Sequence, residues 1–252
     1  MFKKIINKTD YILIFSDLFE LFLKHDENKI ILSLEEIIDF LIKKKKTIIL
    51  PTFNLNFPKT KKTSFSPEFI QTGFANKYLI EKYDFKRTKK PMYNFAVLGP
   101  KYNSILKLKQ STAWGENSVI GHLVKKKSTA IGLNINKKTF DWHVIHHCEE
   151  MFKVPYRYYK IFSGRNLDLN SKVYEKMYVR DLKSNYIRDG SKLNNILIKK
   201  RRIKNFNYKI INISLLNLYD YYIEAEKLLR KNIYSLVKNE KKSWAIVNKK
   251  FS

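Results

Sequence analysis

The densest group of ionisable side chains lies in segment 143–150, which reads His-Val-Ile-His-His-Cys-Glu-Glu. If this segment is helical, His143, His146 and either Glu149 or Glu150 share one face, because helical residues three or four apart are neighbours. A carboxylate one turn from an imidazole can hold its Nδ1–H and leave Nε2 free as a base. The pattern therefore permits general-base chemistry centred on His146.

Two other interpretations of this segment stay open on spacing alone. The pattern H-x-x-H-x-x-E could bind a metal, although it is not H-E-x-x-H and the single cysteine leaves no Cys pair for a zinc site. The segment could also be a solvated helix face. We treat His122 and His147 as structural or solvated, and Cys148 as a packed thiol.

The apolar runs of the chain predict the strands that would position this segment. Runs of strand length are bounded by turn residues, and they alternate along the chain with longer helical patterns. This order indicates an α/β architecture, with no internal repeat and no domain boundary within residues 1–252. The expected strands cover 11–15, 47–50, 94–98, 129–133, 172–182 and 208–213.

Capping residues and helical periodicity predict the helices. Ser16 and Asp17 are candidate caps of a helix that follows the first strand. Ser33 and Glu36 resemble a capping box that opens a helix to about residue 44. The basic run 199–202 is expected in a loop or hairpin. Further helices are expected over 68–83, 101–109, 143–152 and 215–237.

The chain is strongly basic, with 50 Lys and Arg against 23 Asp and Glu and a formal net charge of +27. Such a surface attracts anions, which include nucleic acids, acidic lipids and phosphate-bearing small molecules. The single cysteine excludes an intrachain disulfide, as is typical of a reducing compartment. No apolar run approaches the about 20 residues that span a bilayer, and no signal-peptide cleavage site is evident. We therefore expect a cytoplasmic protein without a membrane span.

Several segments between residues 47 and 164 resemble, in order and at compatible spacing, the motifs of the aminoglycoside 3-N-acetyltransferase family. Segment 10–18 resembles the first strand of that family, whereas residues 166–252 match it only loosely. The matching segments are 48–53 (I-I-L-P-T-F), 71–73 (Q-T-G), 87–99 (R-T, P, F-A-V and G), 113–118 (A-W-G-E-N-S), 146–150 (H-x-x-E-E) and 155–164 (P-Y-R-Y with K, F and G).

The resemblance implies an antibiotic N-acetyltransferase-like α/β/α architecture, with a mixed central sheet flanked by helices. It also implies direct transfer of an acetyl group from acetyl-CoA to a primary amine, without a metal. His146 would be the general base, oriented by Glu149 or, as second choice, by Glu150. The residues expected to bind the coenzyme are Ser16, Thr52, Arg87, Gly115 and Ser118. Arg157 is expected to form a structural ion pair.

The chain departs from the family pattern at three positions. Lys90 replaces a histidine before the proline, His143 replaces a threonine three residues before the base, and Asp17 replaces the second serine of the N-terminal segment. The first two departures lie where the family would shape its acceptor pocket.

The acceptor is inferred from charge. Enzymes that act on polycationic aminoglycosides are expected to present an acidic pocket, so this basic chain favours an anionic acceptor, namely a nucleotide-linked amino sugar used for surface polysaccharide. One alternative is an aminoglycoside acceptor, as in antibiotic resistance. Another is a basic nucleic-acid-binding protein, against which stand the even spread of the basic residues and the lack of a recognised nucleic-acid motif. A homodimer is compatible with the sequence.

Overall fold

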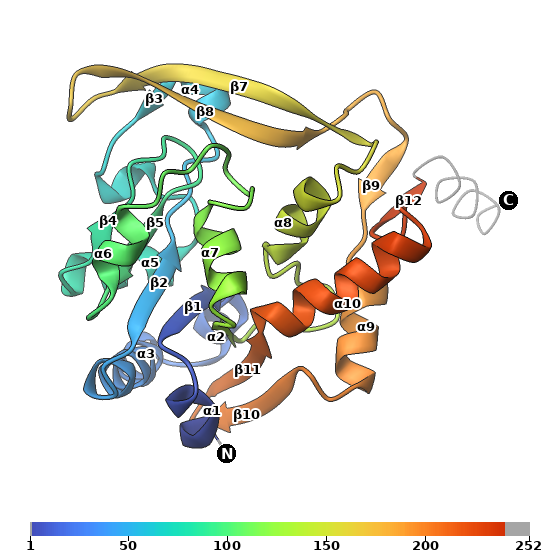
Figure 1. Cartoon of the computed structure of the whole chain (residues 1–252). Coiled ribbons are helices and arrows are strands. Elements are labelled where there is room, and N and C mark those ends of the chain that lie inside the picture. The colour runs from blue at the N-terminus through green and yellow to red at the C-terminus, as the bar shows by residue number, and fades with distance from the viewer. Residues whose placement is uncertain (1, 240–252) are drawn as a thin grey trace, which may run out of the picture.

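A seven-stranded mixed sheet is the centre of the computed structural model, which describes residues 2–239 (Figure 1). The central strand β1 (Tyr11–Ser16) runs parallel to both of its neighbours, β6 and β2, whereas the other pairs are antiparallel. The expectation of a mixed central sheet flanked by helices is therefore confirmed. The strand order is β10 (Lys204–Tyr208), β11 (Ile211–Asn217), β6 (Thr129–Leu133), β1, β2 (Thr47–Pro51), β5 (Phe95–Leu98) and β4 (Lys86–Arg87).

Strand β1 is apolar on both faces because helices cover both sides of the sheet. Ile12 and Ile14 belong to a hydrophobic cluster on one face, whereas Leu13 and Phe15 belong to the cluster on the other. Alternate residues of a strand point to opposite faces, so one short apolar run supplies both cores.

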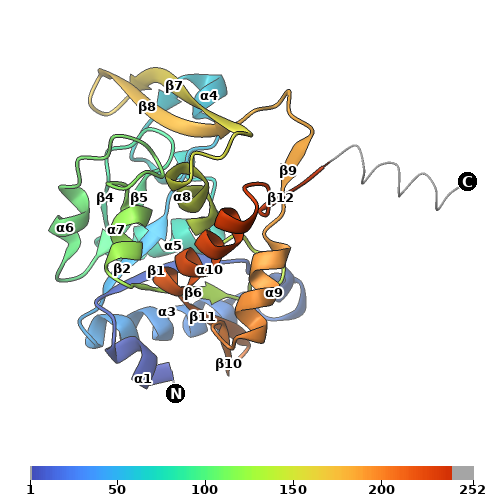
Figure 2. The ribbon, with the colours of Figure 1, turned by 45° about the vertical axis from the view of Figure 1, so that its right-hand side comes forward.

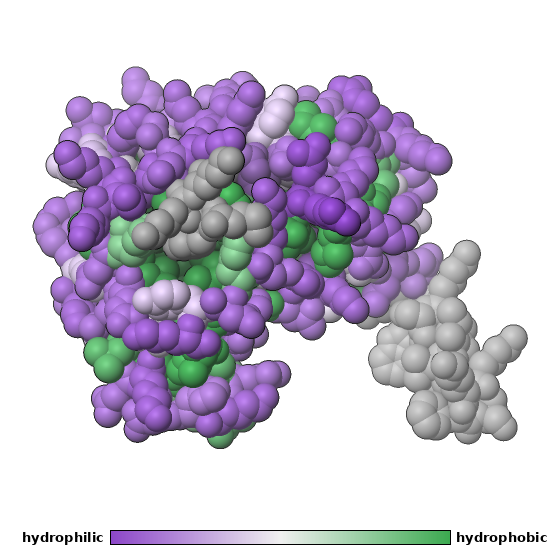
Figure 3. Space-filling view, turned by 90° about the horizontal axis from the view of Figure 1, so that it is seen from below, coloured by the Kyte–Doolittle hydropathy of each residue, from purple (hydrophilic) through white to green (hydrophobic). Residues whose placement is uncertain are grey.

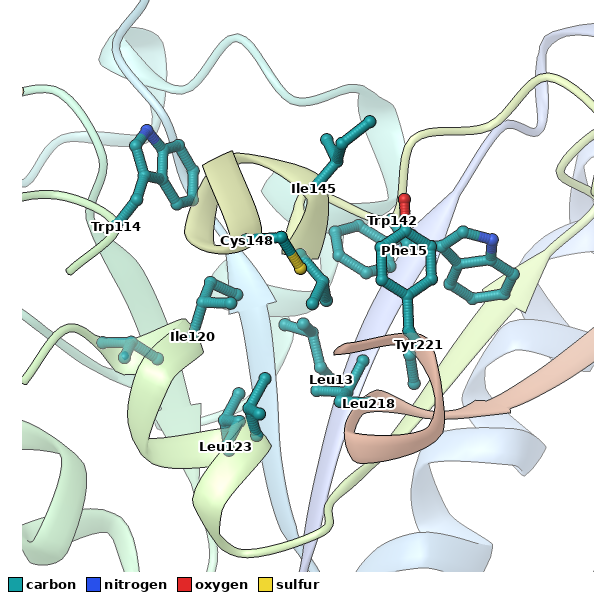
Figure 4. Close-up of a cluster of buried hydrophobic side chains, with 14 of the residues drawn as sticks. Leu13, Phe15, Trp114, Ile120, Leu123, Trp142, Ile145, Cys148, Leu218 and Tyr221 are labelled. Atoms are coloured by element: carbon teal, nitrogen blue, oxygen red, sulfur yellow. The ribbon is translucent and has the colours of Figure 1, made fainter. Parts of the chain in front are cut away.

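Helices packed on the Ile12 face are α2 (Phe19–Lys24), α3 (Glu27–Lys43) and α5 (Phe74–Lys82). The opposite face carries α7 (Val119–Lys125), α8 (Val144–Met151), α9 (Ser191–Lys199) and α10 (Leu218–Lys231). Figure 4 shows this second core, in which the Cys148 sulfur of α8 points into a cluster that includes Leu13 and Leu218. The expectation of a packed thiol fits this buried cysteine.

Two small sheets lie outside the central one. The long hairpin of β7 (Arg157–Asn166) and β8 (Ser171–Arg180) lies across the top of the molecule above α8, with β3 (Lys62–Thr63) paired to β7 (Figures 1 and 2). Strand β9 (Tyr186–Arg188) pairs with β12 (Val237–Asn239) beside α8 and α10. The remaining helices are α1 (Phe2–Asn7), α4 (Phe57–Thr60), the 3-10 turn η1 (Pro67–Phe69) and α6 (Tyr102–Leu106).

Several predicted helix boundaries are wrong. The helix expected at 215–237 begins only at Leu218, because residues 211–217 pair with β6 as β11. The helix expected over 68–83 is divided into η1 and α5. Ser16 and Asp17 do not cap α2, whose N-cap is Leu18 without a side-chain hydrogen bond. Across residues 2–239, no helix combines the length and apolar character needed to cross a bilayer.

The capping box expected at Ser33 is also wrong. Helix α3 already begins at Glu27, where the Asp26 carboxylate accepts a hydrogen bond from the Lys29 amide at 3.2 Å. Ser33 lies within the helix, and its hydroxyl donates to the carbonyl of Lys29 at 2.7 Å. An unpaired amide in the first turn gains more from a cap than a carbonyl that already has a helical partner.

We therefore predict opposite sensitivities for the two candidate caps. Asp26→Ala should lower the free energy of unfolding by about 1 kcal/mol, because it removes the partner of a first-turn amide. Ser33→Ala should change it by less than about 0.5 kcal/mol, because alanine suits a helix interior and no polar group loses its only partner. Urea unfolding of both variants tests this, and a larger loss for Ser33→Ala would contradict the assignment of the cap.

Candidate active site

Helix α8 packs one face on the hydrophobic core and carries the ionisable cluster, of which Glu149 and Glu150 are themselves buried. Val144, Ile145 and Cys148 are buried in the core beneath the helix, so the intervening residues face the opposite side. Trp142 and His143 both have left-handed backbone conformations, with φ of 52° and 51°. His143 is therefore the N-cap of α8 and not part of the helix. Its expected place on a shared helical face is wrong, although its ring lies 6.1 Å from that of His146.

The structure places Glu149, and not Glu150, beside His146. The His146 Nδ1 atom lies 3.3 Å from Oε2 of Glu149, as the spacing of three residues in a helix allows. Glu149 is fully buried, and the same carboxylate oxygen forms an ion pair with Nη2 of Arg157 at 2.8 Å. Arg157 also donates through Nη1 to the carbonyl of Tyr178 at 3.1 Å. The expected structural ion pair of Arg157 thus involves the residue that faces His146.

A second arginine contacts the other side of the His146 ring. The guanidinium of Arg188, on β9, lies with Nη1 2.7 Å from Nε2 of His146, while Nη2 pairs with the Asp141 carboxylate. Nδ1 lies 3.3 Å from Glu149 and also 3.2 Å from Nη2 of Arg157, so both ring nitrogens face a guanidinium. Because a guanidinium only donates, the shorter contact with Arg188 favours Nε2 as the acceptor, which places the proton of the neutral ring on Nδ1 beside Glu149. This is the tautomer that a general base requires.

The surroundings of His146 keep its ring neutral. Burial lowers the pKa of His146 well below its ordinary value, and the charges of Arg157 and Arg188 lower it further. Burial raises the pKa of Glu149, an effect that Arg157 opposes. Burial likewise raises the pKa of Asp141, and Arg188 opposes it. Glu149, which contacts His146, is therefore matched by Arg157, and Asp141 is matched by Arg188.

Aromatic rings surround the His143 side chain, which forms one side of the site. Its ring lies parallel to Trp114 with centroids 6.0 Å apart, and Phe15 and Phe53 each lie 5.3 Å away. Trp114 also contacts the His146 ring at 5.1 Å. Burial lowers the pKa of His143 to about 3, so this side chain is neutral and contributes to an apolar wall.

Glu150 belongs to a different group, on the side of α8 nearest Gly115. Its Oε1 accepts a hydrogen bond from the Thr112 hydroxyl at 2.6 Å, and that hydroxyl accepts one from the Gly115 amide at 2.9 Å. A side chain at residue 115 would place its Cβ 2.4 Å from the Thr112 oxygen, so this turn requires glycine. A cavity of about 350 Å³ opens here and is lined by Gly115, Glu150, Lys153 and Lys176 among others.

The other expected coenzyme-binding residues have differing surroundings. Ser118 is buried as the N-cap of α7, and its hydroxyl accepts from the Gly121 amide at 3.1 Å. Ser16 is half-buried at the carboxyl end of β1. Thr52 follows β2 directly and donates its hydroxyl proton to Asn94.

The Arg87 guanidinium is directed into the fold. It donates to the carbonyl of Phe65 at 2.8 Å, to that of Thr52 at 3.1 Å and to the side chain of Asn94. Burial lowers the pKa of Arg87 to about 10. These bonds connect β4 to Thr52 and Phe65 in the segments that follow β2, so they use most of the donors that we expected to bind the coenzyme.

Sequence reasoning missed Arg188 and Asp141. Neither lies within a turn of His146 along the chain, and neither belongs to a motif, so no local signal could have identified them. His147 and His122 have structural surroundings, since His147 contacts the Trp114 carbonyl at 2.6 Å and His122 packs edge-on against Tyr11. Lys90 donates to the Gln110 carbonyl at 2.9 Å. In the part of the chain that the structure describes, no group of three or more His, Cys, Asp and Glu side chains is arranged to hold a metal.

Comparison with known proteins adds a family and a set of structural neighbours. Residues 30–230 match the profile of the family described as aminoglycoside 3-N-acetyltransferase. The fold is similar to that of AAC-VIa bound to sisomicin, with a TM-score of 0.68 and 12% identity over 90% of this chain and 94% of that one. No curated protein matches the chain in sequence.

Two further solved structures share the fold. AAC-IIIb in a binary complex with CoASH has a TM-score of 0.68 and 12% identity, over 88% of this chain and 90% of that one. The YokD protein from Bacillus subtilis has a TM-score of 0.64 and 16% identity, over 91% of each chain. At these identities the likeness establishes the fold alone.

The two arginines lead to a prediction about the titration of His146. Wild-type His146 should stay neutral below the ordinary histidine pKa of about 6.5, because burial, Arg157 and Arg188 all oppose its protonation. Arg188→Ala removes one cation, so the pKa of His146 should rise. An NMR titration of the imidazole resonances measures this, with Arg165→Ala on the exposed hairpin as the matched control. An unchanged pKa in Arg188→Ala would contradict the contact with Nε2.

Proposed function

Because the chain belongs to the aminoglycoside 3-N-acetyltransferase family, we propose that it transfers the acetyl group of acetyl-CoA to an amine of an amino sugar, with His146 as the general base. The observation that carries this proposal is the hydrogen-bond arrangement of His146, whose Nδ1 faces Glu149 and whose Nε2 accepts from Arg188. One similar structure is bound to sisomicin and another to CoASH, which supports an amino-sugar acceptor and a coenzyme A thioester as the acetyl donor.

The chemistry requires a neutral amine beside Nε2. Most sugar amines are protonated at neutral pH, so the amine must lose a proton before it attacks. The amine would take the position of the Arg188 guanidinium and donate its N–H to Nε2. As the C–N bond forms and the C–S bond breaks, the amine proton passes to His146 and then to the leaving thiolate. The Glu149 carboxylate stabilises the transient imidazolium.

The acetyl-CoA contacts are proposed around the turn that contains Gly115. The cavity beside this turn supports the proposal, because Lys153 and Lys176 can attract coenzyme phosphates while the glycine allows close approach of the main chain. Ser118 would act by capping the N-terminus of α7. Ser16 lies at the carboxyl end of β1. The remaining two expected residues would act by positioning: Thr52 and Arg87 hold the loops after β2.

The general-base role predicts a selective loss of turnover. His146→Ala should lower kcat by about 10²–10⁴-fold, which is the usual contribution of a positioned base, and should leave coenzyme A affinity unchanged. Thiol release measures the first quantity and titration calorimetry the second. His25→Ala, which removes an exposed histidine, is the control and should retain full activity. Equal activity of the two variants would remove His146 from the mechanism.

Two classes of amino sugar are candidates for the acceptor of the acetyl group. The family and the sisomicin-bound neighbour favour an aminoglycoside. One observation favours the second candidate, an anionic acceptor such as a nucleotide-linked amino sugar. Glu149, which contacts His146, and Asp141, which contacts Arg188, are already paired with arginines, so they are not available to the several ammonium groups of an aminoglycoside. Arg188, by contrast, has N–H groups left to bind an acid group of the acceptor.

Arg188→Ala distinguishes the two acceptor classes. If the acceptor is anionic, the variant should lose roughly tenfold in kcat/KM for a UDP-linked amino sugar and gain for sisomicin, since a change of about 1.4 kcal/mol corresponds to a factor of ten. If the acceptor is an aminoglycoside, wild type should already prefer sisomicin by a wide margin. A gain for both acceptors would mean that Arg188 restrains the base without selecting the acceptor.

A further inference from the structure

A second cavity lies at the amino ends of the central strands β1 and β6, opposite the candidate active site. It has a volume of about 490 Å³ and is bordered by Thr9 before β1 and by Thr129 at the start of β6. The aromatic wall around His143 instead meets Phe15 near the carboxyl end of β1. A strand of this length separates its two ends by roughly 16 Å, so the two places are distinct.

Cations from separate parts of the chain meet at this cavity. Lys8 follows α1, Lys127 follows α7, and Lys204 begins β10. The turn between α9 and β10 adds Lys200, Arg201 and Arg202, which belong to the basic run noted in the sequence. A single cation near the carboxyl end of a helix is favourable by itself. This effect does not explain why the cations that follow α7 and the cations that follow α9 lie at the same cavity.

The cavity carries a net positive charge that its own carboxylate does not balance. Asp220 is the one acidic residue that lines it, and this side chain is paired with Arg202 at 3.3 Å. Lys200 is paired with Glu224 at 2.7 Å, outside the lining. Among the described residues, Lys8, Arg201 and Lys204 form no ion pair.

Other lining groups suit a ligand with both polar and apolar parts. Thr129 is 4% exposed, yet its hydroxyl makes no hydrogen bond to any described residue. Ile5 adds a partly exposed apolar side chain, whereas Leu215 and Leu216 border the cavity but are almost fully buried. Figure 3 shows the molecule from below, the side on which α1 and β10 lie in Figure 1, and hydrophobic residues there are surrounded by hydrophilic ones.

We propose that this cavity binds a multiply phosphorylated small molecule of nucleotide size. Its volume lies in the range of small-molecule sites, and its unpaired cations attract phosphate groups from several directions. The Thr129 hydroxyl, which has no hydrogen-bond partner among the described residues, supplies a directional hydrogen bond. A local cavity bordered by several cations fits a compact ligand better than a long nucleic acid, which tracks an extended basic groove.

Calorimetry with ATP in magnesium-free buffer tests the site, with saturating coenzyme A present to occupy the acyl-transfer site. We expect one equivalent of ATP to bind, and the neutral nucleoside adenosine to bind far more weakly. Arg201→Glu combined with Lys204→Glu should weaken ATP binding tenfold or more, because both residues are exposed and their charge reversal opposes the phosphates. Thr129→Val should weaken it severalfold by removing the hydroxyl alone.

Lys43→Glu combined with Lys59→Glu is the matched control, since it makes the same change in net charge at exposed residues outside the cavity. The proposal is overturned if ATP does not bind, if coenzyme A displaces it, or if the control weakens binding as much as the cavity variant. It is also overturned if a single-stranded oligonucleotide binds more tightly than ATP and depends on the same two residues. Failure of the acyl-transfer assignment would instead appear as a lack of coenzyme A binding, with the ATP result unaffected.

Discussion

The buried ion pair between Glu149 and Arg157 is the interaction on which the candidate active site depends. Glu149 is fully buried on α8, and a carboxylate in such a place is stable only when it is paired and hydrogen-bonded. Its partner is the first residue of β7 and also donates to the Tyr178 carbonyl on β8. The ion pair therefore connects the helix that carries His146 to the hairpin above it, and the orientation of the imidazole depends on the docking of both.

The second arginine, Arg188, affects the balance of charge around His146. Arg188 lies between Nε2 of His146 and solvent, with Asp141 as its counter-ion. The immediate surroundings of the base are thus close to neutral although the chain carries a net charge of +27. Net charge describes the long-range field of a protein, whereas the chemistry at one imidazole is decided by groups within a few ångströms. Unbalanced positive charge gathers instead at the opposite ends of the central strands, around Lys127 and Arg201.

The short apolar strands at the centre of the sheet could be predicted because such a run between turn residues has few other places in a compact fold, whereas the polar strand β7 was not expected and the strand expected at 208–213 spans the turn between β10 and β11. Tyr11–Ser16, Thr47–Pro51 and Thr129–Leu133 lie within a residue of their expected positions. The start of α10 was mispredicted because residues 215–217 continue the helical pattern, yet they gain a full set of hydrogen bonds by pairing with β6. Local periodicity is a weak preference, and pairing between distant segments overrides it.

The sequence by itself determined the α/β fold class, the family resemblance and the pairing of His146 with a carboxylate one turn away, because helix geometry places residues three and four apart side by side. Only the tertiary structure decided which carboxylate faces the imidazole. Glu149 is held there by Arg157, while Glu150 is held by Thr112. The tertiary structure alone also brought Arg188 to Nε2, since that contact spans 42 residues. Contacts of this kind follow from how separate elements pack, and no spacing along the chain records them.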